Sequence, residues 1–281
     1  MSAPTADGVD SLPPGRWQDL FDPGLRRVAV YDDGVVMEDD AVSFLKGTPS
    51  DIADIVFLDP PFNLGKRYGA LPAREDRLPP RNYEDYMGET LSLAVRALKP
   101  GGSLFLYHLP KFAMSFGERL KTELDFRHWI AISMKNGFSH RAALYPAHYA
   151  LLYFTKGIPS HFVRPKVPVS VCRHCGKPIK DYGGYAKHVE DGLSLSDFWD
   201  DISPVRHKSR KSRGSNELPA RVMDRILGMA GHHGGLIVDP FAGSGSTGVA
   251  ARRVGMRFVL NDRDAASCEV ITSRLGVDGG S

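Results

Sequence analysis

The stretch LIVDPFAGSGSTGVAA, residues 236–251, decides the fold of this 281-residue chain. Its apolar start predicts a buried β-strand that ends at Asp239, and its last residues predict a helix. Between them, Gly243, Gly245 and Gly248 form a GxGxxG pattern, which favours a tight turn from a strand into a helix. The stretch therefore predicts a Rossmann-like sheet with a ligand site beyond the carboxyl end of this strand.

Strands and helices alternate on both sides of this stretch. Apolar runs predict strands at residues 28–33, 35–40, 52–59, 103–108, 126–135, 149–157 and 257–262. Helical patterns occur at residues 41–47, 83–100, 111–124, 217–230 and 246–255. Because buried strands that alternate with helices form parallel sheets covered on both faces, we expect an α/β fold.

Composition divides the chain into four segments. Residues 1–27 predict a mobile, Pro-rich lead-in that lacks the order of a signal peptide. Residues 28–157 and 214–281 predict the two halves of one α/β domain. Residues 158–213 are broken by Pro and Gly and predict an insertion; the stretch 155–213 holds 12 Lys and Arg against 6 Asp and Glu. That excess can hold a polyanion, although a solvated basic face has the same composition.

Cysteine usage and hydropathy limit the class of protein. No apolar run reaches the roughly 18 residues of a membrane helix, so we expect no membrane partner. Three cysteines, Cys172, Cys175 and Cys268, give no disulfide framework, which favours the cytoplasm. Cys172 and Cys175 have zinc-knuckle spacing, but His188 and His207 are poorly spaced to complete four ligands. A tight turn with two reduced thiols is the alternative, and no metal is assigned.

Two acids favour a cationic ligand over a dinucleotide at the glycine turn. Asp239 lies at the mouth of the turn, where it would repel a pyrophosphate and attract a cationic group. S-adenosylmethionine carries both a sulfonium and an ammonium group. Asp262 follows the next predicted strand, where a carboxylate can accept hydrogen bonds from both ribose hydroxyls of an adenosine. The two acids together predict S-adenosylmethionine as the cofactor.

A second predicted strand ends in LDPPFN, residues 58–63. Asp59 and the Pro60 carbonyl offer two hydrogen-bond acceptors, while the prolines bring no N–H groups. Two acceptors can bind both protons of an adenine or cytosine amine and free its lone pair to attack a methyl group. Pro61 fixes the direction, and stacking of the base on Phe62 would contribute about 1–3 kcal/mol. A base within a duplex must be flipped out to reach such a site.

In these residues the chain resembles the DNA amino-methyltransferases that carry a (D/N/S)PP(Y/F/W) catalytic motif. Their FxGxG donor motif is present here as Phe241-Ala-Gly-Ser-Gly. The catalytic motif precedes the insertion and the donor motif follows it, which is similar to the order in the bacterial β group. The resemblance covers about residues 28–275. It implies a methyltransferase sheet, S-adenosylmethionine as cofactor, and residues 158–213 as the target-recognition region.

The resemblance also extends the set of donor-binding residues. Asp40 is expected near the donor's adenine, although Asp39 stands where such enzymes have glycine. Residues 216–218 are expected at the methionine end of the donor. The complete predicted donor set is Asp40, Asn216, Glu217, Leu218, Asp239, Phe241, Gly243, Gly245, Thr247 and Asp262.

Basic residues near both motifs are candidates for contact with double-stranded DNA. The loop 64–82 could close over a flipped base, and the run RHKSRKSR, residues 206–213, suits phosphate contacts. A solvated linker is the alternative for that run. The predicted DNA-binding residues are Lys66, Arg67, Arg206, His207, Lys208, Arg210 and Lys211.

The resemblance implies a sequence-specific DNA methyltransferase. The Asp and Phe of the catalytic motif favour adenine N6, whereas cytosine-N4 enzymes more often begin this motif with serine. The alternatives are a cytosine-N4 enzyme, an RNA methyltransferase, a DNA-binding protein without catalysis, and an NAD oxidoreductase, which leaves DPPF unexplained. A cognate restriction endonuclease and a second copy of the chain are further partners that the resemblance allows.

Overall fold

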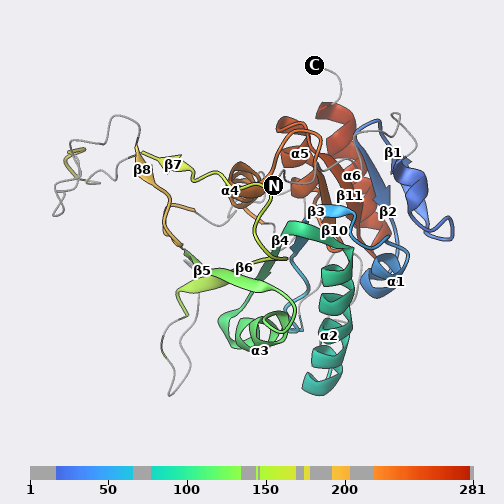
Figure 1. The fold of residues 1–281 in the computed structure, drawn as a ribbon, viewed down its shortest axis with the longest axis horizontal. Coiled ribbons are helices and arrows are strands. Elements are labelled where there is room, and N and C mark those ends of the chain that lie inside the picture. The colour runs from blue at the N-terminus through green and yellow to red at the C-terminus, as the bar shows by residue number, and fades with distance from the viewer. Residues whose placement is uncertain are drawn as a thin grey trace, which may run out of the picture.

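The computed structural model describes residues 17–65, 77–133, 144, 146–168, 174–177, 192–202 and 218–278. A nine-stranded sheet runs through it in the order β1-β2-β11-β10-β3-β4-β6-β5-β9 (Figure 1). Its strands are β1 (Arg27–Val30), β2 (Gly34–Met37), β3 (Ala53–Leu58), β4 (Leu98–His108), β5 (Asp125–Ser133), β6 (His148–Thr155), β9 (Phe198–Trp199), β10 (Leu236–Asp239) and β11 (Arg257–Asn261). The short strands β7 (Lys166–Val167) and β8 (Leu193–Ser194) pair with each other outside this sheet.

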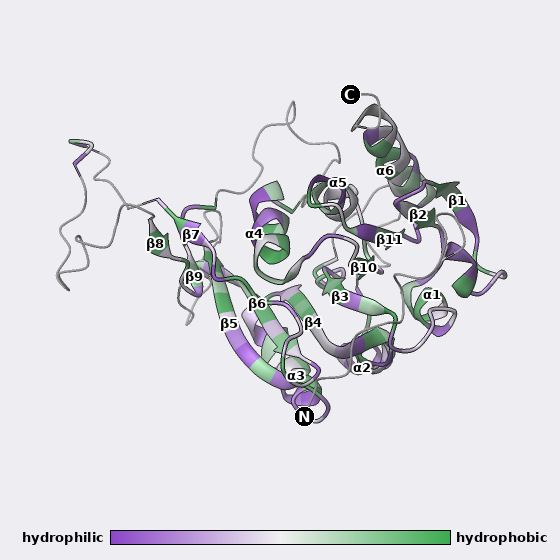
Figure 2. Cartoon of the chain, turned by 45° about the horizontal axis from the view of Figure 1, so that its top comes forward, coloured by the Kyte–Doolittle hydropathy of each residue, from purple (hydrophilic) through white to green (hydrophobic). Residues whose placement is uncertain are grey.

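Helices cover both faces of the sheet, which confirms the predicted α/β fold. They are η1 (Trp17–Leu20), α1 (Ala41–Lys46), α2 (Pro80–Ala97), α3 (Pro110–Leu120), α4 (Ala220–Ala230), α5 (Ser246–Arg253) and α6 (Ala265–Asp278). Val56 and Leu58 of β3 face the core beneath α1, α2 and α3, while Ile55 and Phe57 face the core beneath α4, α5 and α6. Hydrophobic residues lie on one side of α4 and hydrophilic residues on the other (Figure 2).

The sheet contains antiparallel pairs beside the predicted parallel strands, and β1 is antiparallel to β2 at one edge. Strands β2, β11, β10, β3 and β4 are parallel, but β6 is antiparallel to both β4 and β5. The sheet is therefore mostly parallel, with antiparallel pairs among its outer strands. Antiparallel neighbours need no crossover helix between them, and the predicted strands at 126–135 and 149–157 follow each other without a predicted helix.

Helix α2, strand β4 and helix α6 also differ from the prediction. Helix α2 begins at Pro80, inside the predicted loop 64–82, with proline in the first turn where its missing N–H costs nothing. Strand β4 begins at Leu98, before the Pro-Gly-Gly that was expected to separate helix from strand. Helix α6 was not predicted, although Cys268, Ile271 and Leu275 are buried at helical spacing.

The pair β3–β10 is the point where the strand order reverses. Ile237 pairs with Ile55 and Val238 with Val56, in parallel. From β10 the chain passes through α5 to β11 on one side, and from β3 it passes through α2 to β4 on the other. Because these connecting helices lie on opposite faces, a ligand crevice is expected beyond the carboxyl ends of the two strands.

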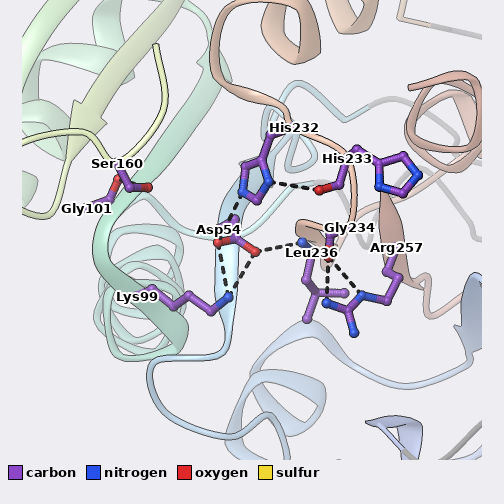
Figure 3. A network of polar contacts seen from close by, with 9 residues as sticks. All are labelled: Asp54, Lys99, Gly101, Ser160, His232, His233, Gly234, Leu236 and Arg257. Atoms are coloured by element: carbon purple, nitrogen blue, oxygen red, sulfur yellow. Dashed lines mark hydrogen bonds and ion pairs between the residues drawn. The ribbon is translucent and has the colours of Figure 1, made fainter. Parts of the chain in front are cut away.

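At the amino ends of the strands, the Asp54 carboxylate of β3 joins three neighbouring strands (Figure 3). Its Oδ2 accepts a hydrogen bond of 2.7 Å from the Leu236 N–H in β10. Lys99 Nζ of β4 lies 3.1 and 3.0 Å from its two oxygens, and His232 Nε2 lies 3.6 Å from Oδ1. These contacts fix how β3, β4 and β10 begin, and so where their carboxyl ends stand relative to one another.

Strand β9, within the predicted insertion, lies against the nine-stranded sheet. Strand β9 pairs with β5, with Ile132 opposite Trp199. The Trp199 side chain is fully buried, and the Arg225 guanidinium of α4 lies 5.1 Å from its ring centroid. Arg225 also contacts Asp201 at 2.6 Å. Trp199 and Asp201 are thus held by both β5 and α4.

Some sequence predictions fall on parts of the chain that are not described. Cys172, His188 and His207 lie outside the described residues, so the question of a zinc knuckle stays a prediction. Cys175 is exposed and Cys268 is buried. Across the described ranges, none of the helices combines the length and the apolar character that crossing a membrane requires.

Removing the Asp54 carboxylate is expected to destabilise the sheet. Asp54→Ala leaves the Leu236 N–H and the Lys99 ammonium without their common acceptor, which should lower the free energy of unfolding by about 1–3 kcal/mol. Denaturant titration followed by circular dichroism measures this loss. Glu118→Ala is the control, because its carboxylate is 80% exposed and pairs with Lys121 at 3.5 Å; it should change stability by less than about 1 kcal/mol. Equal losses in both variants would contradict the role of Asp54.

Candidate active site

The two motifs found in the sequence lie side by side. Asp59 lies in the loop that follows β3. Asp239 is the last residue of β10, which neighbours β3 in the sheet. Both loops therefore open at the carboxyl edge, beside the reversal of strand order. The sequence indicated that both acids stand at strand ends, and the strand order makes those ends adjacent.

Asp239 is buried and both of its carboxylate oxygens accept hydrogen bonds. The Phe241 N–H donates to Oδ1 at 3.0 Å, and the Thr247 hydroxyl donates to Oδ2 at 2.6 Å. Burial raises the pKa of Asp239 to about 7, against the lowering effect of these two donors and with a smaller contribution from the Asp262 carboxylate. The site thus holds an acid that titrates near neutral pH and favours a cationic neighbour.

Asp262 ties the end of β11 to the glycine turn. Its Oδ2 accepts from the Gly243 N–H at 2.9 Å, and its Oδ1 accepts from the Asp264 N–H at 3.0 Å. Gly243 and Gly245 have φ values of 55° and 76°, in the left-handed region that favours glycine. A Cβ at Gly245 would also lie 3.1 Å from Ile271. The turn therefore needs these glycines for its own geometry.

Asp40 lies at the carboxyl end of β2, which neighbours β11. It is the N-cap of α1, and its Oδ1 accepts from the Val42 N–H at 2.9 Å. Tyr86 of α2 places its hydroxyl 3.4 Å from Oδ2. Asp39, which stands in place of the family's glycine, accepts the Asp40 N–H on its own side chain at 2.8 Å.

Asn261 is a residue of this crevice that the sequence did not single out. It is fully buried, and its Nδ2 donates to the Asp39 carbonyl at 3.0 Å and to the Pro240 carbonyl at 3.2 Å. One side chain thus holds the loop after β2 to the loop after β10. In the sequence, Asn261 is a polar residue at the end of an apolar run and directly precedes Asp262, a predicted donor-binding residue.

Aromatic rings surround the DPPF segment. Phe62 is 5% exposed, and its ring centroid lies 6.0 Å from Tyr107, 4.9 Å from His108 and 5.8 Å from Tyr149. Burial, with the Asp59 carboxylate adding to it, raises the pKa of both Tyr107 and Tyr149 above the ordinary value. The half-buried Tyr149, not Phe62, is the more exposed ring near Asp59. Neither tyrosine was predicted, since each lies within an apolar strand pattern.

The two proline carbonyls have different surroundings. The Pro61 carbonyl accepts a hydrogen bond of 2.6 Å from the Tyr83 hydroxyl of α2. Within the described ranges, no donor contacts the Pro60 carbonyl. The acceptor pair that the sequence predicted, Asp59 with the Pro60 carbonyl, stays a prediction.

Several predicted residues lie outside the described part of the chain, and their roles stay predictions. Leu218 is described: it is 8% exposed and packs in the core beneath α4. The others are Lys66, Arg67, Arg206, His207, Lys208, Arg210, Lys211, Asn216 and Glu217.

Three acids at neighbouring strand ends determine which ligand fits. Asp40, Asp262 and Asp239 follow or end β2, β11 and β10, which are consecutive in the sheet. A row of acceptors suits a ligand with hydroxyl and cationic groups and repels phosphate. The residues present therefore fit the S-adenosylmethionine predicted from the sequence better than a dinucleotide.

Comparisons with known proteins agree with this geometry. The N6_N4_Mtase family model, described as DNA methylase, matches residues 53–273. Type II methyltransferase M.BamHI of Bacillus amyloliquefaciens is 40% identical over 246 residues, which are 87% of this chain but only 57% of that protein. PvuII DNA methyltransferase, described as cytosine-N4-specific, matches with a TM-score of 0.62 and 16% identity, over 89% of this chain and 94% of its own. The M1.HpyAVI–SAM complex matches with a TM-score of 0.58 and 15% identity, over 85% and 98%.

Proposed function

The chain belongs to the DNA methylase family, and on that premise we propose that it is a sequence-specific DNA methyltransferase. It transfers a methyl group from S-adenosylmethionine to the exocyclic amine of a flipped-out base, with adenine N6 favoured by the Asp-Pro-Pro-Phe form of the motif. The observation that carries the proposal is the adjacency of β3 and β10. It brings the loop with Asp59, which would bind the base, next to the glycine turn after Asp239, which would bind the methyl donor. Both lie at the carboxyl ends of the strands, where two substrates can meet.

The donor would lie in the acidic crevice beyond β2, β11 and β10. Asp262 would accept hydrogen bonds from the ribose hydroxyls of the donor, and Asp40 would lie near its adenine. The backbone of the turn around Gly243 would approach the donor closely. Bound S-adenosylmethionine would supply an electrophilic methyl group on a cationic sulfur. Asp239 would balance the positive charge, which favours the ionised form of a carboxylate whose pKa is raised to about 7. The SAM complex among the similar structures supports this choice of ligand.

The acceptor loop would prepare the amine for attack. The Asp59 carboxylate and the Pro60 carbonyl would accept hydrogen bonds from the two amine N–H groups, which draws the nitrogen towards tetrahedral geometry and frees its lone pair. The nitrogen–methyl bond would form as the methyl–sulfur bond breaks, and the methylated nitrogen would then lose one proton to solvent. Positioning and electrostatics would provide most of the rate enhancement, without a covalent enzyme intermediate. The rings around Asp59, Phe62 and Tyr149 among them, would provide an apolar slot for the flipped base.

The remaining segments are proposed to serve DNA recognition. Residues 28–157 and 214–281 form the two halves of the methyltransferase domain, and residues 158–213 between them are the target-recognition region. The motif order, DPPF first and FAGSG last, supports assignment to the β group. The basic runs at 64–82 and 206–213 would contact phosphates of double-stranded DNA. A cognate restriction endonuclease and a homodimer are further proposals, suggested by the resemblance.

Methyl transfer from labelled S-adenosylmethionine to unmethylated duplex DNA tests the proposal directly. Digestion to nucleosides and mass spectrometry should identify N6-methyladenine. N4-methylcytosine would keep the mechanism and change the base. Donor binding without any methylated product would overturn the proposed activity and favour a DNA-binding protein without catalysis or an enzyme that acts on RNA.

Substitutions at Asp59 distinguish a hydrogen-bond acceptor from a general base. Asp59→Ala should lower the single-turnover rate by about 10²–10³-fold, since one preorganised partner of the amine is lost. Asp59→Asn keeps an acceptor oxygen and should retain more of the rate than Asp59→Ala. Asp125→Ala, an exposed acid on β5, is the control and should leave the rate unchanged. If Asn and Ala were equally slow, the carboxylate charge rather than its acceptor geometry would be required.

Donor affinity should increase as the pH rises through about 7. Below this pH Asp239 is protonated and neutral, and above it the carboxylate can pair with a cationic donor. Thr247→Val removes a hydrogen bond that lowers the pKa of Asp239, so the increase should move to higher pH. Titration calorimetry with S-adenosylmethionine between pH 5.5 and 8.5 measures this shift, and Asp239→Asn should remove the dependence. A profile that moves to lower pH in Thr247→Val would contradict the assignment.

A further inference from the structure

Three hydrogen bonds form a continuous chain behind the DPPF loop. The Leu109 N–H donates to His108 Nδ1 at 2.8 Å. His108 Nε2 lies 2.7 Å from the Tyr83 hydroxyl, and that hydroxyl lies 2.6 Å from the Pro61 carbonyl oxygen. The chain links the end of β4, the first turns of α2 and the catalytic loop, three segments that are far apart in the sequence.

Its two ends determine the direction of every hydrogen bond. A backbone N–H can only donate, so His108 Nδ1 must be the acceptor. A carbonyl can only accept, so the single hydroxyl proton of Tyr83 must point to Pro61. Tyr83 must then accept from His108, which requires the neutral imidazole with its proton on Nε2. No other arrangement of protons satisfies all three contacts.

The surroundings keep this arrangement unchanged across the working pH range. His108 is fully buried and Tyr83 is 3% exposed. The rings of Phe112 and Phe116 enclose both, with centroids 5.0 and 5.4 Å from the imidazole. Burial, with the Lys111 ammonium adding to it, lowers the pKa of His108 to about 3. The imidazole and the Tyr83 ring are thus almost completely removed from solvent.

The hydrogen bond from Tyr83 occupies one of the two proline carbonyls and fixes the loop around it. We infer that Tyr83 and His108 are positioning residues for methyl transfer: they hold the Pro61 carbonyl toward the protein, so that the Pro60 carbonyl and Asp59 receive the amine. The inference rests on the proposed function. It assigns roles to two residues that touch neither substrate, on elements outside both sequence motifs.

Tyr83→Phe tests the role with little change in packing, since only the hydroxyl is lost. The single-turnover rate of methyl transfer should fall by about tenfold to a hundredfold, because a small displacement of the acceptor misaligns the amine. The dissociation constants for S-adenosylmethionine and for DNA should stay within about twofold, because the Tyr83 side chain is buried and only 3% exposed. A full rate in Tyr83→Phe would overturn the inference.

Two further variants separate positioning from a general effect on the fold. His108→Gln keeps a side-chain N–H that can donate to Tyr83 and should retain more of the rate than His108→Leu, which has no donor. Tyr153→Phe is the matched control: this tyrosine is also buried, and its hydroxyl lies 3.4 Å from Ser103 within the sheet. It should keep the wild-type rate. Equal rate losses in Tyr83→Phe and Tyr153→Phe would indicate a structural role only.

Nitrogen NMR of His108 tests which ring nitrogen carries the proton, without any activity measurement. The wild-type protein should show a neutral ring protonated at Nε2, with no titration between pH 5 and 8, and Tyr83→Phe should shift the Nε2 resonance. A charged ring or a proton on Nδ1 would overturn the inference. An inactive wild-type enzyme with the expected histidine signal would overturn the proposed function instead, so the two failures are distinguishable.

Discussion

The parallel pairing of β3 with β10 is the constraint on which the site depends. At the amino ends of the strands, the Asp54 carboxylate stabilises this pairing. It contacts Lys99 of β4 and accepts a hydrogen bond from the Leu236 N–H of β10. Because the connections from the two strands lie on opposite faces, their carboxyl ends stay uncovered and face one crevice. Without this register, an acid after β3 and an acid ending β10 would be two unrelated turn residues.

Electrostatics make the donor half of this crevice costly to fold. Asp239 has a pKa raised to about 7, so its contribution to stability is fully present below the pKa of the unfolded chain and is lost as the pH rises through 7. Near neutral pH Asp239 is therefore a buried carboxylate whose ionised form the fold disfavours. A cationic ligand offsets this penalty, which links the stability of the domain to binding. Thr247 and the Phe241 N–H reduce the penalty without removing it.

The loop with Asp59 after β3 is held in place in a different way. Prolines restrict its backbone, but its orientation depends on partners from other elements: Tyr83 from α2, His108 from β4, and the ring of Tyr149 from β6. On the donor side, Asn261 plays a comparable part, since it ties two loops through their carbonyls. Side chains from other elements thus hold the loop after β3 and the glycine turn in place.

The sequence alone determined the local chemistry: a strand, a glycine turn and a helix at 236–251, and an acid with two prolines after a second strand. These features depend on backbone preferences and periodicity within a few residues, which any reader of the chain can see. Only the tertiary structure decided that β3 lies beside β10, that β6 runs antiparallel, and that Tyr83 contacts Pro61, 22 positions away in sequence. Such contacts leave no local pattern, because a tyrosine on an amphipathic helix has the same signature whether its hydroxyl meets water or a catalytic loop.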